Sequence, residues 1–139
     1  QNVRDNPAVV GSLGPEIMRG LTPLARRRRT AVHAYALGSK AIRKGDNVVM
    51  WYRSGNRDSD AIENADQCII DRARPRQHIS FGFGIHRCVG QLLARMEGEI
   101  VLTVLARHAR TLKLAGEPVR RINNTLRGLA SLPVEIEPA

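Results

Sequence analysis

The segment His78–Glu97, HISFGFGIHRCVGQLLARME, joins a glycine-rich loop to the start of the clearest helix in the chain. Gly82 and Gly84 precede Cys88 in this loop, and because glycine lacks a Cβ atom the backbone can pass close to a flat ligand there. The N-terminus of a helix carries about half a positive charge, and its free N–H groups can hydrogen-bond sulfur. Since both effects favour a thiolate, the sequence predicts a tight loop that delivers the thiol of Cys88 to a helix N-terminus.

Three roles are open for Cys88. A buried structural cysteine is the ordinary role of this residue type, and the two functional roles are a nucleophile paired with His86 and a single axial thiolate ligand to a haem iron. The first two leave the spacing of the glycines unexplained, whereas the third accounts for every position. Together with Cys68 the chain has two cysteines, too few for a disulfide framework or a four-thiolate metal site.

The helix after the loop is marked by apolar residues at intervals of three and four, which place one continuous stripe on a helix of about five turns. This apolar stripe consists of Val89, Leu92, Leu93, Met96, Ile100, Val101, Val104 and Leu105. The opposite positions are Gln91, Arg95, Glu99 and Thr103. The pattern predicts a long amphipathic helix directly after Cys88.

The remaining sequence divides into segments of different character. Residues 7–20 predict a short helix, and the proline in residues 22–31 argues against a helix there. Residues 31–52 predict strand, turn, short strand, turn and strand. Residues 53–80 show no period and predict a long ordered meander, and three short β segments are expected after Arg110.

Length and composition are those of a globular domain. Of the 139 residues, 42% are apolar and 25% are charged. No stretch approaches the ~18 consecutive apolar residues of a membrane span, and the first residues lack the apolar core of a secretory signal. The sequence does not begin with Met, so we expect it to be a piece of a longer protein.

The chain is strongly basic, with a formal net charge of +9, and 19 of its 22 basic residues are arginine. Such a charge attracts acidic partners, which include nucleic acid, anionic lipid and acidic proteins. A nucleic-acid-binding module is disfavoured because only 4% of the residues are aromatic and no zinc-finger spacing occurs. We therefore expect neither a nucleic acid nor a membrane as partner.

Two motifs carry a resemblance to a known family. Phe81, Gly84, His86, Cys88 and Gly90 fill the pattern F-x-x-G-x-H-x-C-x-G, which resembles the haem-binding signature of the cytochrome P-450 superfamily. Upstream, EIMR at residues 16–19 matches the family's E-x-x-R motif. The segments TPLARRRRTA, LGSKAIRKGDNVVMWY and SGNRD between the motifs are similar to the family's usual sequence in this region.

The resemblance extends from Pro15 to Pro138 and covers only the C-terminal part of the family's sequence. It implies a mixed α/β, mainly α fold with the E-x-x-R helix, small β-sheets, the meander, the haem-thiolate loop, the long proximal helix and a C-terminal β-hairpin. Residues 1–139 are then one segment of a single haem-binding domain. The oxygen-activating helix of the family precedes Glu16 and has no counterpart here. We therefore expect no catalytic residue in this segment and no native haem binding or catalysis by the segment alone.

The resemblance implies haem b as the cofactor and gives the loop residues their roles. Cys88 is the axial ligand of the haem iron, and a thiolate ligand favours O–O cleavage, as the chemistry of this family illustrates. Phe81 packs against the haem near the sulfur and shields it from water. Gly82 and Gly84 belong to the same haem-binding loop.

His86 and Arg28 are the residues that the resemblance assigns to the haem propionates. A guanidinium suits a carboxylate because it can bind it through two parallel hydrogen bonds. Without the resemblance, His86 is an ordinary satisfied polar residue, and the run Arg26–Arg29 is a solvated basic face or a nucleic-acid patch. The family often has His and an apolar residue where this chain has Arg26 and Arg27.

Glu16 and Arg19 share one face of the first predicted helix because they are three residues apart. An exposed pair of this kind contributes under ~1 kcal/mol to stability. The resemblance instead implies a buried structural triad, completed by Arg72 of the meander, that braces the loop carrying Cys88.

Two short segments line the substrate pocket in the family. Leu24 and Ala25 follow the E-x-x-R helix, and Thr125 and Leu126 lie in the turn of the C-terminal hairpin. Both segments are largely apolar, which suits a small hydrophobic substrate.

The segments VVMWY, SGNRD and SLPVEIEP, with the haem-thiolate loop, are most similar to bacterial soluble alkane and fatty-acid ω-hydroxylases. This implies a cytoplasmic enzyme, monomeric when complete, that inserts oxygen from O₂ into a terminal C–H of a medium-chain alkane or fatty acid. Its electrons come from an acidic ferredoxin and its reductase, for which Arg74, Arg76 and Arg87 are candidate contacts. The alternative is an inactive remnant or partial sequence of such an enzyme.

Overall fold

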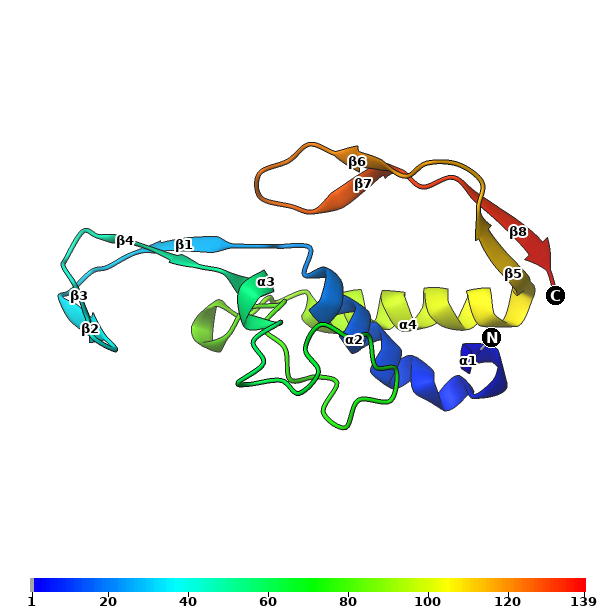
Figure 1. Cartoon of the computed structure of the whole chain (residues 1–139), viewed down its shortest axis with the longest axis horizontal. Coiled ribbons are helices and arrows are strands. Elements are labelled where there is room, and N and C mark those ends of the chain that lie inside the picture. Colours follow the sequence, from blue (N-terminus) through cyan, green and yellow to red (C-terminus); the bar gives the residue numbers. More distant parts are fainter. Residues whose placement is uncertain (1) are drawn as a thin grey trace.

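The computed structural model describes residues 2–139, which form an elongated molecule with two helices crossing near its middle and paired strands extending to either side (Figure 1). The helices are α1 (Asn2–Asp5), η1 (Pro7–Val9), α2 (Val10–Leu21), α3 (Tyr52–Gly55), η2 (Gly84–His86) and α4 (Gln91–His108). The strands are β1 (Arg27–Thr30), β2 (Tyr35–Leu37), β3 (Lys40–Ile42), β4 (Asn47–Met50), β5 (Ala109–Leu114), β6 (Val119–Arg121), β7 (Gly128–Ser131) and β8 (Val134–Pro138). Among the residues described, no helix is both long and apolar enough to cross a membrane.

The short helix predicted over residues 7–20 corresponds to two consecutive elements, the 3-10 turn η1 and the helix α2. The side chain of Asn6 caps this turn, because its Oδ1 accepts the N–H of Ala8 at 3.3 Å. The helix ends at Thr22, which adopts a left-handed φ of 40° and donates its N–H to the carbonyl of Met18 at 3.0 Å. The direction in which the chain leaves α2 is therefore fixed by Thr22.

The helix α4 confirms the long helix predicted after Cys88, but its apolar stripe is exposed, and Leu92 for example is 74% exposed. The side of α4 that faces α2 carries Ala94, Gly98 and Leu102, and a cavity of about 320 Å³ lies between the two helices. The polar positions opposite the stripe, such as Arg95, are the less exposed ones. The helix thus packs on α2 through its small and polar side, and the apolar stripe is left uncovered by the described residues.

Four two-stranded antiparallel sheets occur in the described part of the chain, β1 with β4, β2 with β3, β5 with β8, and β6 with β7. The strands β2, β3 and β4 lie within residues 31–52, as predicted. The strand β1 was not predicted, because four consecutive charged residues lack the alternation of apolar and polar residues that marks a half-buried strand. Arg28 of β1 pairs with Val49 of β4.

The C-terminal region has four strands where three β segments were predicted. The first of them, β5, follows α4 without a turn, since α4 ends at His108 and β5 begins at Ala109. A bridge between Leu24 and Leu126, and a 2.7 Å hydrogen bond from the N–H of Arg127 to the carbonyl of Pro23, join the C-terminal hairpin to the segment after α2.

The meander confirms the prediction of an irregular segment, since between α3 and η2 the structure assigns no helix or strand. Its interior is mainly polar. The largest fully buried side chains of the described residues are Arg19, Glu16, Asn56 and Thr22. The buried apolar residues among those described are Val10, Pro15, Tyr52 and Ala65. Because so little apolar surface is buried here, hydrogen bonds and ion pairs hold the meander on α2.

Candidate functional site

A buried ion cluster joins α2 to the meander. Glu16 and Arg19 lie one turn apart on α2 and are 1% and 2% exposed. Arg19 binds the carboxylate through two bonds, Nη2 to Oε1 at 2.7 Å and Nε to Oε2 at 2.9 Å. Arg72 of the meander donates from Nε to Oε2 at 3.0 Å. The structure thus brings together the three residues that the sequence assigned to a triad.

The carboxylate of Glu16 is held in its charged form. Burial raises the pKa of Glu16, but the hydrogen bonds from Arg19, from the backbone N–H of Ile69 and from Arg72 outweigh burial and lower this pKa to about 2. The partner Arg19 has a raised pKa, because its hydrogen bond to Glu16 favours the charged guanidinium. Both members of the pair are therefore ionised at neutral pH.

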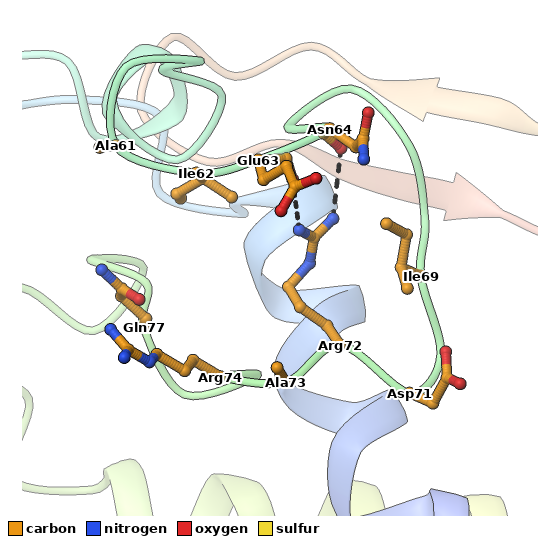
Figure 2. Close-up of a pocket in the computed structure, with 10 residues that line it drawn as sticks. All are labelled: Ala61, Ile62, Glu63, Asn64, Ile69, Asp71, Arg72, Ala73, Arg74 and Gln77. Atoms are coloured by element: carbon orange, nitrogen blue, oxygen red, sulfur yellow. Dashed lines mark hydrogen bonds between the residues drawn. The ribbon is translucent and has the colours of Figure 1, made fainter.

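The two arginines of the triad use their remaining N–H groups on backbone carbonyls of the meander. Arg19 donates from Nη1 to Asn56 O and Ala65 O at 2.8 and 2.6 Å. Arg72 reaches the carbonyls of Glu63 and Asn64 at 2.6 and 3.2 Å, across a pocket of about 410 Å³ (Figure 2). Each guanidinium therefore fixes the path of an irregular segment that has no ladder of its own.

A second buried cluster lies beside the triad and was not predicted from the sequence. Asn56 is 1% exposed, and its Nδ2 donates to Thr22 Oγ1 at 2.9 Å and to Ser80 Oγ at 2.8 Å. Its Oδ1 accepts the N–H of Ile79 at 2.8 Å. Asn and Ser within a segment that has no period are typical of exposed loops, so no pattern in the sequence indicates their burial.

The loop that carries Cys88 has the tight form that its glycines predict. Gly82 and Gly84 adopt φ of 76° and 62°, in the left-handed region that side chains disfavour. A Cβ atom at Gly82 would lie 3.2 Å from the carbonyl of His86. The N–H of Cys88 donates to the carbonyl of Phe81 at 2.8 Å, which closes the loop just before α4 begins at Gln91.

The thiol of Cys88 is free and exposed, and so is its apolar surrounding. Ile85 is 97% and Val89 100% exposed, and Phe83 is also exposed. Among the described residues no group of three His, Cys, Asp or Glu side chains gathers as a metal site would require. The arrangement can therefore offer a single exposed thiol beside an apolar surface.

Phe81 turns away from this exposed surface towards α2 and α4. Its ring centroid lies 5.9 Å from that of His78 and 5.4 Å from the guanidinium carbon of Arg95. Phe81 also lines the cavity between the two helices. It therefore closes the inner side of the loop, beneath the residues that precede Cys88.

The remaining predicted residues lie in two segments, residues 24–28 after α2 and residues 125–126 of the C-terminal hairpin. Arg28 is exposed on β1 and lines a hollow of about 630 Å³ together with Thr125 of the C-terminal hairpin. The bridge between Leu24 and Leu126 brings two other predicted substrate-pocket residues together. Ala25 is half-buried, and its carbonyl accepts the N–H of Arg53 at 3.2 Å. These two segments are far apart in sequence and adjacent in space. No described contact joins His86 to Arg28.

Comparison with known proteins gives one consistent result. A sequence model of the family described as Cytochrome P450 matches residues 15–138. Cytochrome p450 CYP199A2 of Rhodopseudomonas palustris is 40% identical over 99% of this chain, and linalool 8-monooxygenase of Pseudomonas putida is 37% identical over 98% of it. The solved structure of CYP153D17 from Sphingomonas sp. PAMC 26605 superimposes with a TM-score of 0.90 at 40% identity and covers 98% of this chain. The chain spans about a third of each of these proteins, 33% of the two relatives and 34% of the solved chain.

Removal of the buried carboxylate tests the ion cluster. We expect Glu16→Gln to lower the free energy of unfolding by about 3–5 kcal/mol, because two guanidinium groups lose their charged partner. The exposed pair Arg110–Glu137, at 3.4 Å, provides the control, and Glu137→Gln should change stability by less than about 1 kcal/mol. Urea unfolding at pH 7 measures both variants, and equal effects would contradict a stabilising role of the triad.

A second expectation concerns pH. His78 is half-buried, and burial followed by the nearby charges of Arg95 and Arg87 lowers its pKa from 6.5 to about 4. Since the unfolded chain binds a proton more readily, stability is complete above pH 6.5 and is lost as the pH falls towards 4. The change in unfolding free energy between about pH 7 and 5 should therefore be smaller in His78→Gln than in the parent chain. Glu16 remains charged throughout this window. The matched variant His33→Gln, at an exposed position, should behave as the parent, and an unchanged slope in His78→Gln would refute the expectation.

Proposed function

The chain belongs to the cytochrome P450 family, and from this premise we propose that residues 1–139 form the haem-thiolate segment of a single-domain monooxygenase. The observation that carries the proposal is the loop of Cys88, which presents one exposed thiol directly before α4 while a buried ion cluster fixes the neighbouring meander. The proposed reaction inserts one oxygen atom from O₂ into a C–H bond of a hydrophobic substrate, while the second oxygen atom leaves as water with two protons and two electrons delivered by a ferredoxin.

Members of this family bind haem b, and the residues around Cys88 fit such a group. The surface beside the thiol is apolar, and Gly82 holds a left-handed turn that a side chain would crowd. We propose Cys88 as the axial ligand of the iron, on the loop shaped by Gly82 and Gly84. When bound, the thiolate-ligated iron supplies the chemistry of O₂ activation. The chain itself supplies the ligand, the apolar contact surface and a rigid support.

The acidic edge of haem requires cations, and the described residues offer them. Arg28 has no carboxylate within salt-bridge distance among the residues that the structure describes, so its guanidinium is available. We assign Arg28 and His86 to the two propionates. We propose that the ring of Phe81, which lies beside His78 and Arg95, packs near the sulfur of Cys88 and shields it from water.

We propose that Leu24, Ala25, Thr125 and Leu126 contact the substrate and that this substrate is a medium-chain alkane or fatty acid, hydroxylated at its terminal carbon. The contact between the two segments, made by the Leu24–Leu126 bridge, supports one shared pocket. The runner-up class is a terpene, because one relative is named linalool 8-monooxygenase. The second candidate is an inactive remnant or partial sequence of such an enzyme.

Electron delivery is assigned to a basic face formed by Arg74, Arg76, Arg87 and Arg95. Burial, and then the charges of Arg76 and Arg87, lower the pKa of Arg95, which indicates that Arg76 and Arg87 lie near Arg95. None of the four has a carboxylate within salt-bridge distance in the described part of the chain. A face of this kind attracts an acidic ferredoxin, which its reductase keeps reduced.

The activity is tested with a completed enzyme, a chimera in which the chain replaces the matching third of the Sphingomonas relative, of which it covers 34%. Octane and decanoic acid are supplied with a ferredoxin and its reductase. We expect the primary alcohol and the ω-hydroxy acid from the completed enzyme and no product from residues 1–139 alone. Turnover of linalool or a steroid without primary alcohol would refute the substrate class, and haem binding without any turnover would favour the remnant.

The basic face is tested by charge reversal. Arg76→Glu with Arg87→Glu should raise the KM for ferredoxin by about tenfold, because like charges meet at the contact, and the effect should shrink as salt is added. Arg43→Glu is the matched control, since Arg43 is exposed in the turn between β3 and β4. Steady-state oxidation rates at low and high salt measure both variants. An unchanged KM in the double variant would show that the arginines serve another purpose.

A further inference from the structure

The hydrogen bonds of the triad do not reach the loop that carries Cys88. Within the described residues, the side chains of Glu16, Arg19 and Arg72 bind one another and backbone groups at positions 56–69. The loop needs a different support. We propose that Asn56 is the positioning residue that transmits the rigidity of α2 and the triad to the Cys88 loop, an inference that rests on the proposed haem-thiolate function.

Two bonds join Asn56 to Arg19 and Thr22 at the end of α2, and a third bond between Thr22 and Arg19 closes the circuit. Its backbone carbonyl accepts Arg19 Nη1 at 2.8 Å, and its Nδ2 donates to Thr22 Oγ1 at 2.9 Å. Thr22 Oγ1 in turn donates to the carbonyl of Arg19 at 2.6 Å. The residue is 1% exposed, so these bonds do not compete with water. Asn56 is therefore as firmly placed as the triad itself.

The other half of the Asn56 amide holds the start of the loop. Oδ1 accepts the N–H of Ile79 at 2.8 Å, and Nδ2 donates to Ser80 Oγ at 2.8 Å. Ser80 Oγ passes the link back to α2, because it donates to the carbonyl of Met18 at 2.8 Å. One amide thus binds two consecutive residues of the loop, which fixes both their position and their orientation.

Two backbone bonds carry this position on to the thiol. The N–H of Gly82 donates to the carbonyl of Ile79 at 2.8 Å, and the N–H of Cys88 donates to the carbonyl of Phe81 at 2.8 Å. A displacement of Ile79 and Ser80 therefore moves the acceptor of the Cys88 N–H. Cys88 is exposed and no described side chain holds its sulfur, so the direction of the thiol depends on this backbone path.

An amide is the side chain that this position requires. Two donors and one acceptor are used at once, which Asn supplies and which Leu, of similar size, does not supply at all. Asp keeps the acceptor for Ile79 but loses both donors. A buried carboxylate would also face the hydroxyl oxygens of Thr22 and Ser80, which already donate to backbone carbonyls, so Leu is the variant that removes the amide at nearly constant volume without adding a charge.

The test uses the completed enzyme, loaded with haem, and follows the ferrous–CO spectrum that reports thiolate ligation. We expect Asn56→Leu to speed the loss of the thiolate spectrum at mild urea by about tenfold, equivalent to about 1.4 kcal/mol. Ser80→Ala should give a smaller acceleration that is not added to that of Asn56→Leu in the double variant, because both remove the same link.

Val10→Ala is the control for stability alone, since Val10 is buried in α2 away from the loop. It should lower the unfolding temperature without speeding the loss of the thiolate spectrum at the same distance below that temperature. Should Asn56→Leu not fold, Ser80→Ala still carries the test. Equal behaviour of the Asn56, Ser80 and Val10 variants overturns the inference. A parent enzyme without any thiolate spectrum overturns the proposed function instead.

Discussion

An ionised carboxylate is costly to bury without charged partners, and the burial of Glu16 at 1% exposure is the constraint on which the rest of the structure depends. Arg19 binds this carboxylate from the same helix, and Arg72 binds it from the meander, 56 residues after Glu16. Since each guanidinium has more donors than the carboxylate can accept, the surplus N–H groups bind carbonyls of the meander. One buried charge thereby orders a segment that has no ladder of hydrogen bonds of its own.

The polar interior consists of two neighbouring clusters that hold different segments of the chain. The ion cluster fixes the meander, and the amide of Asn56 continues from it to Ile79 and Ser80 at the root of the Cys88 loop. This arrangement explains why so small a set of buried apolar residues suffices between α2 and the meander. The apolar side chains lie instead on the outer stripe of α4 and around Cys88, where a flat apolar group and further parts of a P450 fold would cover them.

The sequence predicts this molecule best where chemistry restricts the residue type. The glycines and Cys88 of the loop and the helix α4 were all found from spacing, and the E-x-x-R motif pointed to a triad whose three members the structure brings together. The strand β1 was not predicted because its run of arginines has no alternation of apolar and polar residues, and its pairing with β4 decides its conformation. The burial of Asn56 was not predicted for another reason. Its burial follows from the positions of Thr22 and Ser80, which lie far from it in sequence, and no local pattern records such a meeting.

The most direct measurement of the central claim is the ferrous–CO spectrum of the completed enzyme with Cys88 and with Cys88→His. If Cys88 is the axial ligand on a loop held by the buried clusters, the parent gives the thiolate spectrum, and the variant retains haem but loses that spectrum. Retention of the thiolate spectrum in Cys88→His, or haem bound by the parent without it, would contradict the account.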